Sequence, residues 1–259
     1  MIGRPFELKN GFIFVLAEAA GGVYNSSQLK TICEVSEDDS AFLKITEDQR
    51  IGFIINPEHK TEIESKLARV GVLLKNYRGH SFVTPKACLG ELCPKSKQDA
   101  LGDAIDLSDK IGEKLNVQNE SLSVGMNGCE IGCATSATDD VHIIGQTDGY
   151  KISIGGQSCD SPHIAQEVVT HVSKENLAPA LEKIIQIFIE NKNPEETLSN
   201  TVKRIGLDKF TEALSAFSQK PSDRATQQPA RIRARACNPP EPAEHPTGAR
   251  SGCGLRERP

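Results

Sequence analysis

The sequence predicts an α+β protein with two folded regions and a disordered C-terminal tail. Apolar strand-like runs alternate with helical segments in residues 1–80, which is typical of a helix-backed sheet. Residues 81–217 again mix strands and helices, and they carry two close pairs of cysteines. In residues 218–259, arginine and proline largely replace lysine and the apolar residues. These changes predict domains at 1–80 and 81–217, followed by a tail at 218–259 that is either disordered or foreign to the protein.

In the first region, three apolar runs have strand character and two segments have helical periodicity. The strands are expected at residues 11–16, 41–46 and 51–55. One helix is expected at residues 28–35, because the polar residues 25–27 can cap it. Pro57 opens the other helix, in which apolar residues recur every three to four positions from Ile63 onward.

The second region has one helix between its two cysteine pairs, followed by further strands and helices. Ala104, Leu107 and Ile111 mark an apolar stripe along the helix predicted at residues 97–115. The other strands are expected at residues 121–124, 141–145 and 150–154, and the other helices at residues 177–191 and 194–214.

The composition argues against several classes of protein. Seven of the fourteen prolines follow residue 217, so the tail cannot bury enough apolar surface to offset the entropy of ordering it. The net charge of −5 and the aromatic content of 5% argue against a nucleic-acid partner. No apolar run reaches the roughly 18 residues of a membrane span, and no export signal is visible. We therefore expect a cytoplasmic protein that binds neither membrane nor nucleic acid.

Four of the eight cysteines form two close pairs, Cys88 with Cys93 and Cys129 with Cys133. In a reducing compartment, such cysteines are metal ligands or reactive thiols more often than disulfides. Four thiolates suit an iron–sulfur cluster or a structural zinc ion, and the spacing alone does not separate the two. Four ordinary buried cysteines are a third interpretation. Cys33 lies on an apolar helix face and is expected to be a core thiol.

Glycines beside the paired cysteines favour the cluster over ordinary buried thiols. Gly90, Gly128 and Gly132 each lie within two residues of a cysteine of these pairs. Glycine allows the backbone to approach an inorganic core closely and to adopt a positive φ. Backbone N–H groups that are free to point at cluster sulfurs tune the reduction potential.

Several motifs resemble, in order, those of the sirohaem sulfite and nitrite reductases, from about residue 8 to residue 215. The first cysteine pair, with Thr84-Pro85 before it and Gln98-Asp99 after it, resembles the first cluster motif of that family. Asn127-Gly128-Cys129 through Cys133 resembles the second motif. Further similarity lies at residues 45–49, 142–145, 149–156 and 203–207.

The resemblance implies a ferredoxin-like half domain followed by a cluster domain. It implies a 4Fe-4S cluster on Cys88, Cys93, Cys129 and Cys133, with Cys133 also bridging to the iron of a sirohaem. The same resemblance places Thr46, Gln49 and Arg50 at the cofactor and makes Arg78 and Lys86 the candidate catalytic cations. The implied partners are sulfite or nitrite, an electron-donor protein such as ferredoxin, and a second copy or related subunit that encloses the haem.

Asp48 departs from the family pattern, because it occupies the position of an anion-binding arginine. Two like charges at about 4 Å repel each other by roughly 4 kcal/mol at an effective dielectric of 20. We therefore expect poor reduction of sulfite. The alternatives are an iron–sulfur electron-transfer or tetrapyrrole-binding protein without reductase activity, and a module stabilised by zinc.

Overall fold

The computed structural model describes residues 6–38, 41–76, 84–112, 122–134, 137–158 and 161–219. These residues belong to one compact unit, which spans Met1–Ser222. The predicted tail lies outside the described residues from position 220 onward. Ser218 and Gln219, at its start, pair with the strand formed by residues 166–172.

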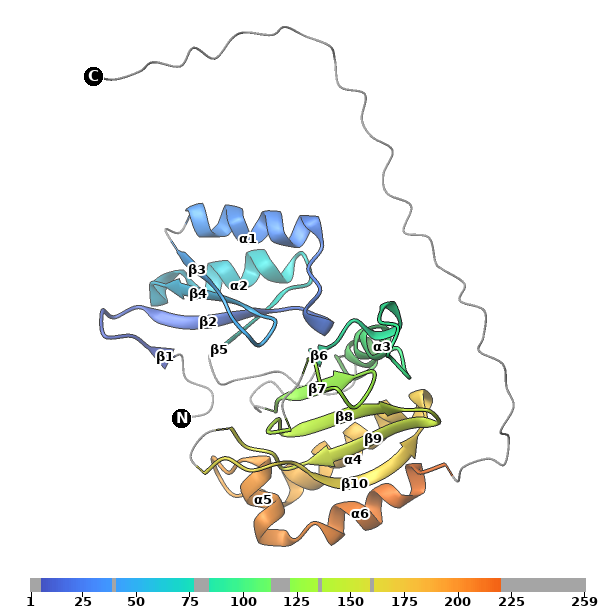
Figure 1. Ribbon diagram of the computed structural model, residues 1–259. Coiled ribbons are helices and arrows are strands. Elements are labelled where there is room, and N and C mark those ends of the chain that lie inside the picture. The colour runs from blue at the N-terminus through green and yellow to red at the C-terminus, as the bar shows by residue number, and fades with distance from the viewer. Residues whose placement is uncertain are drawn as a thin grey trace, which may run out of the picture. The chain divides into compact units, whose positions relative to one another are not determined.

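The first sheet is antiparallel and contains five strands (Figure 1). Its central strand, β2 (Ile13–Glu18), pairs with β4 (Ile51–Ile55), and β4 pairs with the edge strand β3 (Phe42–Ile45). Two further strands pair with β2, namely β1 (Phe6–Glu7) and β5 (Leu73–Asn76). Short 3-10 turns follow β2 and β4, at η1 (Ala20–Gly22) and η2 (Pro57–His59).

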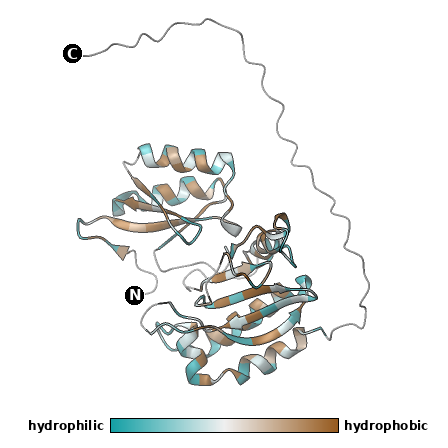
Figure 2. Cartoon of the chain, viewed as in Figure 1, coloured by the Kyte–Doolittle hydropathy of each residue, from teal (hydrophilic) through white to brown (hydrophobic). Residues whose placement is uncertain are grey.

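Two helices, α1 (Ser26–Asp38) and α2 (Lys60–Ala68), cover one face of this sheet (Figure 1). Asn25 and Gln28 exchange side-chain-to-backbone hydrogen bonds at the start of α1, which confirms the predicted cap. Hydrophobic residues run along β2 and recur on the helices (Figure 2). Cys33 is exposed rather than buried, because Ile32 and Val35 provide the core contacts of α1.

The second sheet has the strand order β10-β9-β8-β7-β6. Its strands are β6 (Lys86–Ala87), β7 (Val124–Asn127), β8 (Val141–Gln146), β9 (Gly149–Ile154) and β10 (Gln166–Val172). β6, β7 and β8 are parallel to one another, whereas β8, β9 and β10 are antiparallel. The α+β class is therefore confirmed.

Four helices and two short turns complete this half. They are η3 (Gly90–Leu92), α3 (Ala100–Gly112), α4 (Lys174–Asn191), α5 (Leu198–Ile205), α6 (Asp208–Leu214) and η4 (Ser215–Phe217). Residues of α3 and α4 pack with those of the sheet in one hydrophobic core. Tyr150 is fully buried in that core, and its hydroxyl bonds to Asp103 on α3.

Two predicted elements differ from the structure. The strand before the second cysteine pair runs from Val124 to Asn127 and therefore ends closer to the cysteines than expected. The single helix predicted at 194–214 is two helices, because Gly206 adopts a φ of 89° between α5 and α6. Four strands, β1, β5, β6 and β10, were not predicted. Among the described residues, no helix combines the length and apolar character needed to cross a membrane.

Candidate cluster and cofactor site

The two cysteine motifs meet because they follow neighbouring parallel strands. Cys88 comes directly after β6, and Cys129 comes two residues after β7. Parallel strands end at the same edge of a sheet, so both loops begin there. The backbone N–H of Gly128 donates a hydrogen bond to Cys88 Sγ at 3.1 Å. The fold thus joins two motifs that are 40 residues apart in sequence.

Gly128 also holds the loop that contains Cys93. Its carbonyl accepts hydrogen bonds from the N–H groups of Lys97 at 2.7 Å and Gln98 at 3.2 Å. A Cβ atom at this position would stand 1.7 Å from Ser96 Oγ and 2.6 Å from the carbonyl oxygen of Gln98. Only glycine fits so close to another backbone segment.

We expect Gly128→Ala to separate the two cysteine loops and to reduce cluster loading severely. Overpacking of this kind typically costs about 1–3 kcal/mol, and here the backbone of the second loop must move. The measurements are iron content after anaerobic reconstitution and thermal stability. Gly11→Ala is the control, because Gly11 has a positive φ but a Cβ added there would meet nothing within 4 Å. Equal losses of iron in both variants would contradict this role of Gly128.

All four motif cysteines are free thiols, and Cys133 is exposed. Gly90 and Gly132 adopt φ values of 55° and 73°, as the sequence interpretation expected of glycines near a cluster. Among the described residues, no three His, Cys, Asp or Glu side chains stand close enough together to hold a single metal ion. In a 4Fe-4S cluster each thiolate binds a different iron. The donor set and its two loops fit such a cluster.

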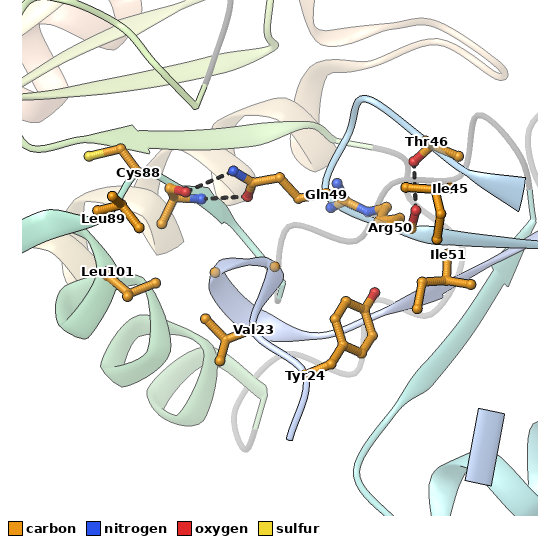
Figure 3. A pocket seen from close by; sticks show the side chains of 13 residues that line it. Val23, Tyr24, Ile45, Thr46, Gln49, Arg50, Ile51, Cys88, Leu89 and Leu101 are labelled. Carbon is orange, nitrogen blue, oxygen red and sulfur yellow. Dashed lines mark hydrogen bonds between the residues drawn. The ribbon is translucent and has the colours of Figure 1, made fainter. Parts of the chain in front are cut away.

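A cavity of about 430 Å³ begins at Cys88 and extends to the turn between β3 and β4 (Figure 3). Its walls are mainly apolar and include Val23, Ile45, Leu89 and Leu101. Three of these four side chains are also strongly exposed: Val23 at 49%, Ile45 at 77% and Leu89 at 64%. Apolar walls of this kind suit the face of a flat hydrophobic ring system.

The structure places all three predicted cofactor-binding residues of the first region, Thr46, Gln49 and Arg50, along this cavity. The side-chain amide of Gln49 makes two hydrogen bonds with the backbone of Ala87 (Figure 3). Its Nε2 donates to the Ala87 carbonyl at 2.8 Å, and its Oε1 accepts from the Ala87 N–H at 3.1 Å. The hydroxyl of Thr46 donates to the carbonyl of Arg50 at 2.8 Å. These contacts fix the β3–β4 turn beside Cys88.

Arg50 forms a buried ion pair with Glu18. Its Nε donates to Glu18 Oε1 at 2.7 Å, and its exposed fraction is only 4%, against 0% for Glu18. Its Nη2 donates to the carbonyl of Thr84 at 3.1 Å, while the Thr84 hydroxyl donates to Glu18 Oε2 at 2.6 Å. Arg50 is the only Lys or Arg among the described residues that line the cavity. Its guanidinium therefore has little capacity left for a ligand.

The second predicted cation, Lys86, is also paired with carboxylates. Its ammonium lies 3.0 Å from Asp139 Oδ1 and 3.3 Å from Asp48 Oδ1, and its side chain is 9% exposed. Asp48 thus pairs with a cation of the chain, and that cation is Lys86. Burial raises the pKa of Asp139, although Lys86 opposes that effect. Arg78, the other predicted catalytic residue, lies outside the described residues.

Sequence analysis did not find Glu18 or Asp139 as parts of this arrangement. A signal for Glu18 was available, because it ends an apolar strand and buried glutamates almost always have a cationic partner. Asp139 gave no comparable signal, since it lies in a loop whose position depends on the tertiary fold.

Asp140, next to Asp139, should make the protein less stable as the pH rises. Burial raises its carboxyl pKa to about 6, although Ser123 donates two hydrogen bonds to it. The native state then holds a proton that the unfolded state releases between about pH 4 and pH 6, so stability falls across that range. We expect Asp140→Asn to remove this fall and to add about 2–3 kcal/mol at pH 7. Urea unfolding at pH 4.5 and pH 7 measures the free energy of unfolding of both proteins. A gain in stability that is equal at the two pH values would show that the pKa of Asp140 is not raised in the native state.

An α+β domain that brings two cysteine motifs to one sheet edge has the arrangement expected of a cysteine-ligated cluster domain. The model of the family described as nitrite and sulphite reductase 4Fe-4S domain matches residues 79–221, more than half of the chain. The protein belongs to this family.

Similar curated proteins include reductases and one methyltransferase. The chain is 26% identical to the NAD(P)H nitrite reductase of Bacillus subtilis over 80% of its own length and 26% of the relative. It is 22% identical to the assimilatory-type sulfite reductase of Nitratidesulfovibrio vulgaris, over 66% of this chain and 78% of that one. It is also 26% identical to the cobalt-factor III methyltransferase of Priestia megaterium, over 69% of this chain and 32% of that one. The chain thus spans about a quarter to a third of the methyltransferase and the nitrite reductase.

Two solved structures share the fold. The NirA protein of Mycobacterium tuberculosis has a TM-score of 0.65 at 18% identity, covering 79% of this chain and 40% of that one. Dissimilatory sulfite reductase I also has a TM-score of 0.65, at 15% identity, covering 84% of this chain and 72% of that one. These likenesses confirm the predicted fold class.

Proposed function

We propose that this protein is a cytoplasmic redox enzyme of the sulfite and nitrite reductase type, carrying a 4Fe-4S cluster and sirohaem. The observation that carries the proposal is the Cys88–Gly128 contact, which joins the two motifs of a 4Fe-4S domain beside an apolar cavity. If bound, the cluster would supply electron transfer and the sirohaem would supply the site of anion reduction, and Cys133 is the thiolate that would serve both.

The chain's own residues have distinct roles in this proposal. Cys88, Cys93, Cys129 and Cys133 hold the cluster. The side chains of Val23, Ile45 and Leu89 would contact a bound ring, and Gln49 keeps the β3–β4 turn in place at the same cavity. Arg78 and Lys86 are the cations that attract the anion in this proposal, and Lys86 does so against the two carboxylates that pair with it. A ferredoxin-like donor provides electrons, and a second copy or a related subunit covers the exposed apolar walls.

A second candidate function is a cluster and tetrapyrrole protein that does not reduce anions. It is supported by the ion pairs of Arg50 with Glu18 and of Lys86 with Asp48 and Asp139, which leave both buried cations neutralised. The similarity to a methyltransferase agrees with it, because that relative is not named as a reductase.

The absorbance spectrum of anaerobically reconstituted protein tests the cofactors. Sirohaem gives Soret and red bands, a cluster alone gives a broad shoulder, and zinc gives no visible band. A colourless protein that binds zinc would contradict the proposal. Reductant-driven formation of sulfide or ammonia then separates the two candidate functions.

We expect Asp48→Arg to increase the turnover of sulfite or nitrite by roughly 10²-fold, because one preorganised donor typically contributes 10²–10³-fold. The substitution removes a carboxylate from Lys86 and restores positive charge to the turn. Glu47→Arg is the matched control, since it makes the same charge change at the exposed neighbouring position. Anion binding to the oxidised haem should tighten only in Asp48→Arg. A lower rate in that variant would show that the anion binds elsewhere.

A further inference from the structure

A second cavity, of about 400 Å³, lies between the end of β9, the loop of residues 161–164 and α5. Among the described residues, its lining shares no member with the first cavity and includes none of the four motif cysteines. Its walls include the apolar side chains of Ile154, Ile164 and Val202, and they also include Ser199 and His163. Ser161, Gln166 and Lys203 add further polar groups to the lining, so the cavity combines apolar and polar walls, as ligand sites do.

Ser199 and His163 are hydrogen-bonded to each other in the wall of this cavity, from Ser199 Oγ to His163 Nε2. The other ring nitrogen, Nδ1, lies 2.9 Å from the carbonyl oxygen of Ser161. A carbonyl oxygen only accepts, so Nδ1 carries a proton, and in the neutral ring Nε2 then presents its lone pair to the serine hydroxyl. The imidazole is thus in the tautomer that a general base requires.

The carbonyl that orients His163 comes from an unusual backbone conformation. Ser161 has a φ of 90°, which is sparsely populated for any residue other than glycine. Such conformations cost of order 1–3 kcal/mol and persist where the surrounding structure enforces them, often at active sites. Here that conformation accompanies the hydrogen bond to Nδ1. Ser199, His163 and the Ser161 carbonyl are therefore linked by two consecutive hydrogen bonds.

The position of Ser199 favours developing negative charge and small substrates. It lies in the first turn of α5, where the helix dipole stabilises anions. Thr197 caps this helix by accepting from the N–H of Asn200 at 3.2 Å. Ser199 is only 1% exposed but belongs to the cavity lining, so access to it is through the cavity and favours small molecules over polypeptide segments.

We propose that Ser199 is an acylatable nucleophile with His163 as its base, and that the cavity takes short-chain acyl esters. The Ser199 Oγ–C bond forms as the hydroxyl proton passes to His163 Nε2. The ester C–O bond then breaks, and the alcohol leaves with that proton. Water then attacks the acyl-serine as its proton passes to His163 Nε2. The acyl C–O bond to Ser199 breaks, His163 returns the proton to Ser199 Oγ, and the carboxylic acid is released. The site is independent of the cluster and uses no cofactor.

A small alkyl fluorophosphonate tests the site on the full chain, because its phosphorus bonds to an activated serine oxygen as fluoride leaves. We expect one label per chain, located by mass spectrometry on the peptide that carries Ser199. His163→Asn should slow labelling by roughly 10²–10⁴-fold, the usual contribution of a general base. Ser199→Ala should abolish it. Ser215→Ala is the matched control and should label normally, since Ser215 is an exposed serine whose hydroxyl donates to the Glu212 carbonyl.

The result that overturns the proposal is an unlabelled Ser199 in the folded native chain, or equal labelling rates in the native chain and His163→Asn. Circular dichroism establishes that each variant is folded. If Ser199→Ala does not fold, the native labelling site and the His163→Asn rate decide the question by themselves. A purely structural hydrogen bond would make Ser199→Ala less stable but would give no label at Ser199 in the native chain.

Discussion

Cys129→Ser should remove the iron–sulfur cluster and destabilise the half of the protein built on the second sheet. Four thiolates share one inorganic core, and the binding energy of a structural metal centre is also folding energy. Cys129 follows Gly128 directly, so it enters the loop that already contacts Cys88. We expect the native chain to hold about four irons after anaerobic reconstitution and the variant to hold almost none.

Cys33→Ser is the matched control for this experiment, because Cys33 is also a free thiol but lies on α1. It should leave the iron and sulfide contents and the visible absorbance unchanged. A Cys129→Ser variant that retained about four irons would show that the four cysteines are not the ligand set. Loss of iron in both variants would show that the reconstitution responds to thiols in general.

Arg50→Met should lower the free energy of unfolding by about 3–5 kcal/mol, the usual cost of removing one member of a buried ion pair. Glu18 would remain fully buried without the guanidinium that neutralises it. The change also removes the bond from Arg50 to the Asp48 carbonyl, which is 2.7 Å long. We therefore expect the β3–β4 turn to lose its fixed position beside Cys88.

The double variant Glu18→Leu/Arg50→Met provides the internal control. Replacing a whole buried pair by apolar residues is often neutral, so the double variant should recover most of the loss. Lys60→Ala breaks a partly exposed pair with Glu64 and should cost at most about 1 kcal/mol. Urea unfolding measures the free energy of unfolding of Arg50→Met, of the double variant and of Lys60→Ala. A loss in Arg50→Met no larger than that in Lys60→Ala would show that the Glu18–Arg50 pair does not stabilise the fold.

Local patterns in the sequence determined most of the elements and all four thiol ligand candidates. The strand at Ile51–Ile55 is at its predicted position because a continuous apolar run between polar residues has few alternatives. The cap of α1 was predicted from residues 25–27 because capping depends on neighbours in the chain. The cysteine pairs, with their glycines, were recognisable because each motif is local.

The edge strand pairing, the ion pairs and the second cavity were decided by the tertiary structure alone. Ser218 and Gln219 pair with β10, which had no clear alternation to predict it. Lys86 and Asp48 are 38 residues apart in sequence, and Lys86 and Asp139 are 53 apart. No local pattern shows that these charges neutralise each other.

The same reason explains what happened to the predicted site residues. Residue type identified Arg50 and Lys86 as cations, but the fold decided that carboxylates of the same chain would bind them. His163 and Ser199 likewise come together only when a loop packs on α5. A residue's chemical type is fixed by sequence, whereas its capacity to bind a ligand depends on which partners the folded chain brings within hydrogen-bonding distance.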